Sequence, residues 1–254
     1  HAAGVPLIVD NTVATPFLLR PFEHGADIVV HSLTKYLGGH GNSVGGAIVD
    51  SGKFPWAEHK ARFPRLNEPD VSYHGVVYTE ALGPAAFIGR ARVVPLRNTG
   101  AALAPLNAFL ILQGIETLAL RMDRICDNTL EVAEYLRKHA KVEWVNYAGL
   151  PDHADHGLVQ RYMGGRASGI LSFGVKGGFE AGGRFQDALK LITRLVNIGD
   201  AKSLACHPAS TTHRQLSPAE LAKAGVSPDM VRLSIGIEHI DDIIADLEQA
   251  LAAV

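Results

Sequence analysis

The sequence predicts an α/β fold in its first part and an α+β fold in its second. Two apolar segments, 7–9 and 28–31, have the length and composition of buried strands, and a third lies at 46–49. Leucine and other apolar residues then recur at helical spacing from 103 to 136, which predicts one long helix or a pair of helices with a bend at Gly114. We therefore expect a helical link between two structural parts.

The second half mixes strand and helix signals. A segment from 51 to 95, rich in Pro, Gly, His and Arg, comes before the long helix and predicts a surface excursion with one helix near 79–88. After the long helix, strands are expected at 142–147, 170–175 and 231–235, and helices at 183–195 and from Ile240 onward. The predicted boundary divides the chain into 1–127, which includes the long linking helix, and 128–254.

Composition sets limits on the function. The chain has 254 residues, 47% of them hydrophobic and 20% charged, and its formal net charge is −2. Nothing in this balance indicates a nucleic-acid-binding or anionic-membrane surface, and no apolar run approaches the length of a membrane span. Cys126 and Cys206 are the only cysteines and form no CxxC pair, so a reduced, cytoplasmic protein is expected rather than a zinc or disulfide scaffold.

A lysine-containing loop follows the apolar segment 28–31 directly, with the sequence His31-Ser32-Leu33-Thr34-Lys35-Tyr36-Leu37-Gly38-Gly39-His40-Gly41. The amine of Lys35 can condense with an aldehyde, and Ser32 and Thr34 can turn both hydroxyls toward a phosphate. These groups would suit pyridoxal 5′-phosphate. Two alternatives compete: a solvated surface lysine, and a nucleotide phosphate loop, although Tyr36 stands where that motif requires Ser or Thr and the GxxxxGK spacing is absent.

A carboxylate ends the first strand segment. Asp10 follows Leu7-Ile8-Val9, and α/β sheets collect ligands at the carboxyl ends of their strands. If the first two strands are parallel, Asp10 and Lys35 emerge at the same edge. Asp10 could then pair with a pyridinium nitrogen and keep it protonated. The alternative is that Asp10 only caps a turn or helix.

An arginine interrupts the last strand segment. Val231, Leu233 and Ile235 alternate with Arg232 and Ser234, so the arginine points away from the apolar face. Its planar guanidinium suits bidentate binding of a substrate carboxylate. A surface salt bridge is the alternative.

Twelve histidines raise the question of a metal site. His207 and His213 lie six residues apart, and His31 and His40 flank the lysine loop, but none shows the i, i+4 pairing of common zinc sites. No metal site is therefore expected.

Several motifs together resemble the cystathionine/methionine-metabolism family of pyridoxal-phosphate enzymes, from one end of the chain to the other. They are Val9 to Thr12, His31 to Gly41, Arg121-Met122-Asp123, Ser203 to His213 and Val231 to Glu238. Within that family, the block Glu68 to Gly75 resembles an insertion of the sulfhydrylase branch that acts on O-acetylhomoserine.

The resemblance implies the C-terminal part of a type I PLP-dependent transferase large domain, followed by an α+β small domain. It makes Lys35 the Schiff-base lysine, and it gives cofactor-binding roles to Asp10 at the pyridinium nitrogen, Thr12 beside the ring, and Ser32 and Thr34 at the phosphate. Arg232 would bind the substrate's α-carboxylate, with Ser203 lining the same pocket. Cys206 stands where close relatives are expected to have threonine, so an essential hydroxyl there is not expected.

The implied reaction is γ-replacement in methionine biosynthesis, in which O-acetyl-L-homoserine and sulfide give L-homocysteine and acetate. The alternatives are O-succinylhomoserine sulfhydrylase, cystathionine γ-synthase and methionine γ-lyase, or a non-catalytic fragment. The family begins with a longer N-terminal portion, and His1 to Gly4 suggests the end of a helix with Gly4 as its C-cap. We therefore expect a C-terminal fragment of a cytoplasmic homotetramer built of close dimers.

Overall fold

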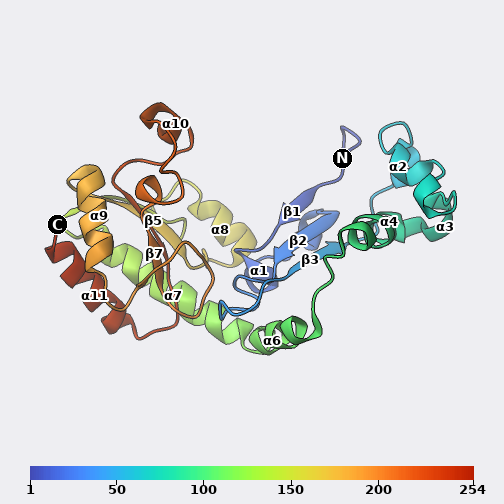
Figure 1. Cartoon of the computed structure of the whole chain (residues 1–254). Coiled ribbons are helices and arrows are strands. Elements are labelled where there is room, and N and C mark those ends of the chain that lie inside the picture. Colours follow the sequence, from blue (N-terminus) through green and yellow to red (C-terminus); the bar gives the residue numbers. More distant parts are fainter.

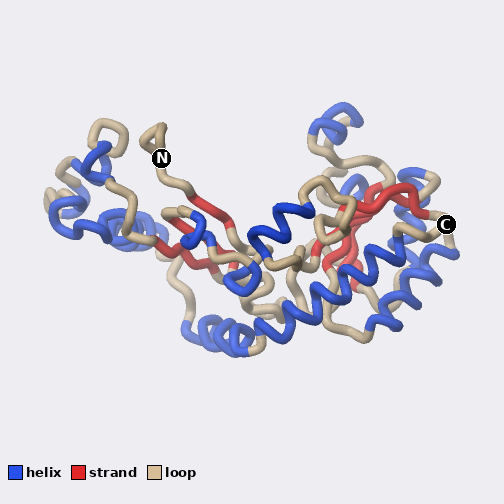
Figure 2. The backbone as a smooth tube through the Cα atoms, turned by 180° about the vertical axis from the view of Figure 1, so that it is seen from behind, coloured by secondary structure: helices blue, strands red, loops and turns tan.

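The computed structural model describes all 254 residues, and its strands form two separate sheets (Figure 1). Viewed from behind, the two groups of strands are distinct, and the chain passes between them through helices (Figure 2). The N-terminus lies beside the first sheet and the C-terminus on the far side of the second. The expected combination of an α/β part and an α+β part is confirmed.

The first sheet contains β1 (Ile8–Asp10), β2 (Ile28–Ser32) and β3 (Gly46–Asp50), in that order. The first two strands are parallel, with Asp10 opposite Val30. Their carboxyl ends therefore meet at one edge of the sheet, as predicted. β3 forms at the expected place but runs antiparallel to β2, because the loop after Lys35 turns the chain straight back. A short helix, α1 (Thr15–Leu18), follows β1.

Residues 51–99 form more regular structure than predicted. Their α-helices are α2 (Pro64–Asn67), α3 (Tyr78–Leu82), α4 (Ala86–Ala91) and α5 (Arg97–Thr99). The single helix expected at 79–88 is interrupted, because Gly83 has a φ of +51° and Pro84 follows it. An aromatic cluster holds the segment together, with Trp56 stacked on Phe87 at 5.6 Å between ring centroids.

Two helices then lead to the second sheet: α6 (Pro105–Glu116) and α7 (Leu118–Leu136). The break falls at Thr117 and not at Gly114. Gly114 is needed for contact, because a Cβ there would lie 2.0 Å from the carbonyl oxygen of Gly38 in the lysine loop. The predicted pair of helices is thus confirmed, with a different role for the glycine.

The second sheet has the strand order β4-β5-β8-β7-β6, and helices pack against it. Its strands are β4 (Val142–Asn146), β5 (Ile170–Val175), β6 (Thr193–Arg194), β7 (Leu204–Cys206) and β8 (Met230–Ser234). The remaining helices are α8 (His156–Met163), α9 (Gly178–Ala188), α10 (Pro218–Lys223) and α11 (Ile240–Ala252). Figure 1 shows α7, α9 and α11 on the same side of the molecule as this sheet.

The helix predicted at 183–195 is wrong in its second half. α9 ends at Ala188, and the Asp246 carboxylate of α11 accepts hydrogen bonds from three successive backbone amides, those of Lys190, Leu191 and Ile192, at 2.9, 3.0 and 2.8 Å. A carboxylate bound to consecutive amides fixes a non-helical turn. The chain therefore leaves the helix and enters β6.

Helix α7 contributes to two hydrophobic clusters. Leu118, Met122 and Ile125 pack with the residues around the lysine loop, whereas Val132 and Leu136 pack in the core of the second sheet. The division at 127/128 lies between these two sets and stays a prediction.

No helix is both long and apolar enough to cross a bilayer. His1 to Gly4 form a turn closed by a 2.7 Å bond from the Gly4 amide to the His1 carbonyl, with Gly4 at a φ of +67°.

Candidate active site

The lysine loop, residues 33–41, places Lys35 immediately beyond the carboxyl end of β2. The turn is closed by two backbone hydrogen bonds, from Gly38 to the Leu33 carbonyl at 2.9 Å and from Gly39 to the Lys35 carbonyl at 2.7 Å. Lys35 is half-buried, and its Nζ donates a hydrogen bond to the side-chain oxygen of Asn197. A lysine held in this way is not a freely solvated surface residue.

Asp10 lies at the same edge and is connected to the lysine loop by hydrogen bonds. The Thr12 amide donates to the Asp10 carboxylate at 3.0 Å, and the Thr12 hydroxyl accepts from the Ser32 amide at 2.8 Å. The Lys35 amide in turn donates to the Ser32 carbonyl at 3.2 Å. Hydrogen bonding from Thr12, through its hydroxyl first and its backbone amide second, lowers the pKa of Asp10. Asp10 is therefore an ionised carboxylate at neutral pH.

The hydroxyls of Ser32 and Thr34, both just before Lys35 in the chain, differ in their hydrogen bonds. The Ser32 hydroxyl is half-buried and forms no hydrogen bond within the chain, so it is free to bind a ligand. The Thr34 hydroxyl donates to the Gly45 carbonyl at 3.2 Å and accepts from the Gly45 amide at 3.1 Å. It closes the loop between β2 and β3, and its predicted contact with a phosphate stays a prediction.

Arg232 on β8 reaches toward the lysine through Asn197. Its Nη2 donates to the main-chain carbonyl of Asn197 at 3.3 Å, while the side chain of Asn197 holds Lys35. Arg232 is half-buried and forms no ion pair with any carboxylate of the chain. The surface salt bridge considered from the sequence is thus absent, and the guanidinium retains donors for a ligand.

Ser203 lies in the interior, next to the turn that follows β8. It is fully buried, its hydroxyl donates to Glu238 at 2.9 Å, and it accepts from the Gly236 amide at 2.9 Å. Both groups belong to the turn after β8. The structure thus gives this hydroxyl a structural role, and its predicted contact with a substrate stays a prediction.

Asn197 is the residue that the sequence reasoning missed. It lies in an irregular stretch after β6, where no spacing or motif indicated a side chain facing Lys35. Only the folding of the second sheet against the lysine loop brings it there: the Ala201 amide donates to the Gly39 carbonyl at 2.8 Å, and the Gly199 amide donates to the Ser234 hydroxyl at 3.0 Å.

The histidines do not gather into a metal centre: no group of three or more His, Cys, Asp or Glu side chains lies close enough to hold an ion. His207 is fully buried, with Nδ1 at 2.9 Å from the Ser210 hydroxyl and Nε2 at 2.7 Å from the Pro228 carbonyl. His31 is buried below the lysine loop, and burial lowers its pKa. Both are core histidines in this fold.

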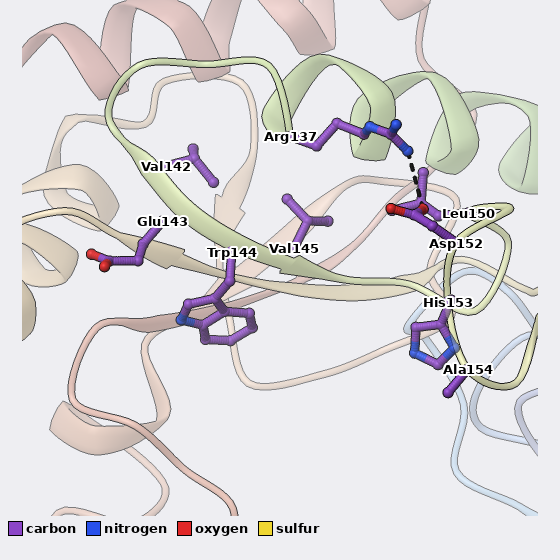
Figure 3. A pocket seen from close by; sticks show the side chains of 9 residues that line it. All are labelled: Arg137, Val142, Glu143, Trp144, Val145, Leu150, Asp152, His153 and Ala154. Carbon is purple, nitrogen blue, oxygen red and sulfur yellow. Dashed lines mark hydrogen bonds and ion pairs between the residues drawn. The ribbon is translucent and has the colours of Figure 1, made fainter.

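A surface cavity of about 580 Å³ lies elsewhere, along β4 (Figure 3). Trp144 and His153 line it, and Arg137 pairs with Asp152 across it at 3.2 Å. None of the predicted site residues contributes to this cavity. The chemical groups around Lys35, and not this cavity, mark the candidate site.

Comparison with known proteins identifies the family. The family model described as "Cys/Met metabolism PLP-dependent enzyme" matches residues 1–252. The chain is 52% identical over 252 residues to a homocysteine synthase of Schizosaccharomyces pombe, covering 99% of this chain and 59% of that protein. It is 54% identical over 250 residues to O-acetyl-L-homoserine sulfhydrylase 1 of Thermus thermophilus, covering 98% and 59%.

Two solved structures support the same family assignment. A Campylobacter jejuni protein carrying N′-pyridoxyl-lysine-5′-monophosphate superimposes with a TM-score of 0.92 at 45% identity, covering 99% of this chain and 60% of that one. A cystathionine γ-lyase from Micromonospora echinospora gives a TM-score of 0.81 at 32% identity, covering 100% and 58%. The chain thus spans somewhat less than two thirds of the length of these relatives. With the family match extending over nearly every residue, the chain belongs to the Cys/Met metabolism family of PLP-dependent enzymes.

Proposed function

We propose that the complete protein catalyses γ-replacement, in which O-acetyl-L-homoserine and sulfide give L-homocysteine and acetate. The bond from Cγ to the ester oxygen breaks, acetate leaves, and a bond from Cγ to sulfur forms. The main support is the placement of Lys35 and Asp10 at the same carboxyl edge of the parallel pair, in a chain about half identical to proteins named as sulfhydrylases of O-acetylhomoserine.

The residues at this edge fit pyridoxal 5′-phosphate. They supply an amine at Lys35, an ionised carboxylate at Asp10 and an unengaged hydroxyl at Ser32. When bound, the cofactor withdraws electrons from the substrate carbon next to the amino group. Asp10 would hold the proton on the pyridine nitrogen, and Thr12 would fix the orientation of that carboxylate. Ser32 would bind the phosphate, with Thr34 shaping the loop around it.

Lys35 would also move protons. Its free amine would take a proton from Cα and one from Cβ before acetate leaves, and would return a proton to each carbon after sulfur has added at Cγ. Such a base must be held near the substrate, and the Asn197 side-chain oxygen gives the amine a fixed position. Because the main-chain carbonyl of Asn197 accepts from Arg232, one residue links the base to the proposed carboxylate-binding group.

A direct assay tests this function. The complete protein, loaded with pyridoxal 5′-phosphate, should convert O-acetyl-L-homoserine and sulfide to homocysteine and acetate in equal amounts. O-succinyl-L-homoserine and cysteine are the comparison substrates, because they separate the sulfhydrylase from the O-succinylhomoserine enzymes and cystathionine γ-synthase. A preference for O-succinyl-L-homoserine over the acetyl ester, or for cysteine over sulfide, would assign the chain to another member of the family. Release of methanethiol from methionine would do the same.

Replacement of Arg232 by lysine should weaken substrate recognition. Lysine keeps the charge and loses the bidentate geometry, so we expect a loss of roughly 2 to 4 kcal/mol in kcat/KM. Cofactor affinity should change little. The measurement compares O-acetylhomoserine with its carboxamide in both proteins, because a carboxylate clamp penalises only the acid.

The matched control is Arg194→Lys. Arg194 is an exposed arginine of the same sheet that pairs with Asp187, and exposed pairs contribute less than about 1 kcal/mol. Equal penalties on acid and carboxamide in Arg232→Lys would show that Arg232 is structural.

A homotetramer built of close dimers, located in the cytoplasm, is part of the proposal. Helix α6 is apolar on nearly every side, yet Leu106, Phe109 and Leu112 are 68%, 57% and 59% exposed. A helix of this kind is normally buried, which supports coverage of this face in the assembled enzyme. Both cysteines are buried free thiols, as suits a reducing compartment.

A further inference from the structure

Arg121 occupies an unusual position for an arginine. It lies on the buried face of α7 between Leu118 and Ile125, and it is 5% exposed. Charged side chains are rarely buried unless they are paired or fully hydrogen-bonded. This residue therefore needs an explanation beyond packing.

The guanidinium is bound to backbone carbonyls at the lysine loop. Nη1 donates to the Tyr36 carbonyl at 2.8 Å, and Nη2 donates to the Leu37 carbonyl at 3.3 Å and the Gly114 carbonyl at 2.6 Å. Nε donates to the Thr117 hydroxyl at 3.2 Å. Tyr36 and Leu37 are the two residues immediately after Lys35. One side chain of α7 thus binds the lysine loop directly after Lys35 and also binds the C-terminal part of α6.

The lysine loop is shaped to accept this side chain. Gly39 has a φ of +67°, and a Cβ on it would lie 2.2 Å from Nη1 and 2.5 Å from Cζ of Arg121. No other residue could therefore stand at Gly39 without displacing the guanidinium. On the opposite side, the Gly39 carbonyl accepts from the Ala201 amide, in the segment that carries Asn197.

No carboxylate forms an ion pair with Arg121. Burial lowers its pKa, and the negative charge of Asp200 opposes that shift. An arginine keeps its charge under these conditions. The carbonyl contacts, with long-range support from Asp200, must therefore compensate the desolvation of a buried charge. A neutral side chain could fill this volume but could not orient three carbonyls.

We propose that Arg121 is a positioning residue for Lys35, which acts through the Tyr36 and Leu37 carbonyls to fix the direction in which the lysine side chain leaves the loop. This inference rests on the proposed role of Lys35 in cofactor binding and proton transfer. The amine lies at the end of four methylene groups, so a small rotation of its backbone moves Nζ away from Asn197. Errors of about 1 Å in such positions can lower rates about a hundredfold.

The test uses the complete protein and two variants, Arg121→Lys and Arg121→Met. Lysine keeps the charge but has a single ammonium, which cannot satisfy the Tyr36, Leu37 and Gly114 carbonyls together. Arg124→Met is the matched control on the exposed side of the same helix, and Asp246→Ala controls for a loss of stability far from the loop.

Two readouts distinguish positioning from general stability. With cofactor removed, hydrogen exchange at the Gly38, Gly39 and Ala201 amides should accelerate in both Arg121 variants and not in either control. With cofactor bound, the pH titration of its visible absorbance should shift, and kcat should fall on the order of tenfold to a hundredfold with little change in KM.

Unchanged loop exchange together with an unchanged absorbance titration in Arg121→Lys would overturn the proposal, even if the melting temperature falls. The same changes in Asp246→Ala would also overturn it, because they would then report global loosening. Failure of the proposed function looks different: borohydride would then trap no cofactor on Lys35 in the unmutated protein, whereas the exchange experiment would still measure the Arg121 contacts.

Discussion

Replacement of Lys35 by alanine in the complete protein should abolish γ-replacement. Lys35 is the only lysine of the loop beyond β2, and the amine would serve both as the cofactor's attachment point and as the base that moves protons at Cα and Cβ. Loss of both roles should lower kcat by at least about 10⁴-fold, since general acid–base catalysis alone contributes up to about that factor.

Intact mass after borohydride reduction provides the second measurement. The unmutated protein should gain the mass of a reduced pyridoxyl phosphate, and the modified peptide should contain Lys35. The Lys35→Ala protein should gain none. Lys53→Ala, which removes an exposed lysine beyond the opposite end of the sheet, should behave like the unmutated protein. Turnover near normal in Lys35→Ala, or a trapped adduct on another lysine, would disprove the assignment.

Replacement of Asp10 by alanine should separate cofactor attachment from catalysis. Lys35 remains, so borohydride should still trap the cofactor. Without a carboxylate at the pyridine nitrogen the ring loses its proton and becomes a poor electron acceptor, and kcat should fall on the order of 10² to 10⁴-fold at saturating cofactor. The Asp10 pKa is lowered, so its charge is lost only as pH falls through that depressed value. No acid limb from Asp10 should therefore occur near neutrality.

A matched control exists within the same sheet. Asp50 also ends a strand, β3, and also accepts a hydrogen bond from the amide two residues ahead, that of Gly52 at 2.9 Å. If Asp10 is only a cap, Asp10→Ala and Asp50→Ala should have equally small effects on kcat. We expect a large effect for Asp10 alone, because β3 runs antiparallel and its end lies at the other edge.

Local sequence patterns predicted most of the elements, because hydrophobic periodicity reflects which face of each element is buried. The parallel pair β1 and β2, the helical link and α11 were all expected. The errors arose where distant residues decide the local structure. Gly114 looked like a helix bend and is a contact point for the Gly38 carbonyl. The segment 189–192 looked helical and is turned by the carboxylate of Asp246, more than fifty residues later.

The residues of the candidate site also divide into those that local sequence could indicate and those that distant contacts decide. Asp10, Ser32 and Lys35 could be named from the sequence because each follows an apolar strand, and parallel strands bring such positions to one edge. The sequence analysis used Arg121 only as part of a family motif and assigned it no role, although it is a charged residue on the apolar face of α7. The expected contact of Ser203 with substrate stays a prediction, and within the chain its hydroxyl bonds to Glu238 and Gly236.

The sequence by itself determined the two-part architecture and the family, and it singled out Lys35 as the lysine proposed to be reactive, because these depend on short-range patterns and on residue chemistry. The tertiary structure alone decided what surrounds that lysine. Asn197 follows it by 162 residues and Arg121 by 86, and no local pattern encodes which side chains from such distances meet. Their positions follow from the packing of α7 and of the second sheet against the lysine loop, since hydrogen bonds and close packing depend on three-dimensional contact and not on spacing along the chain.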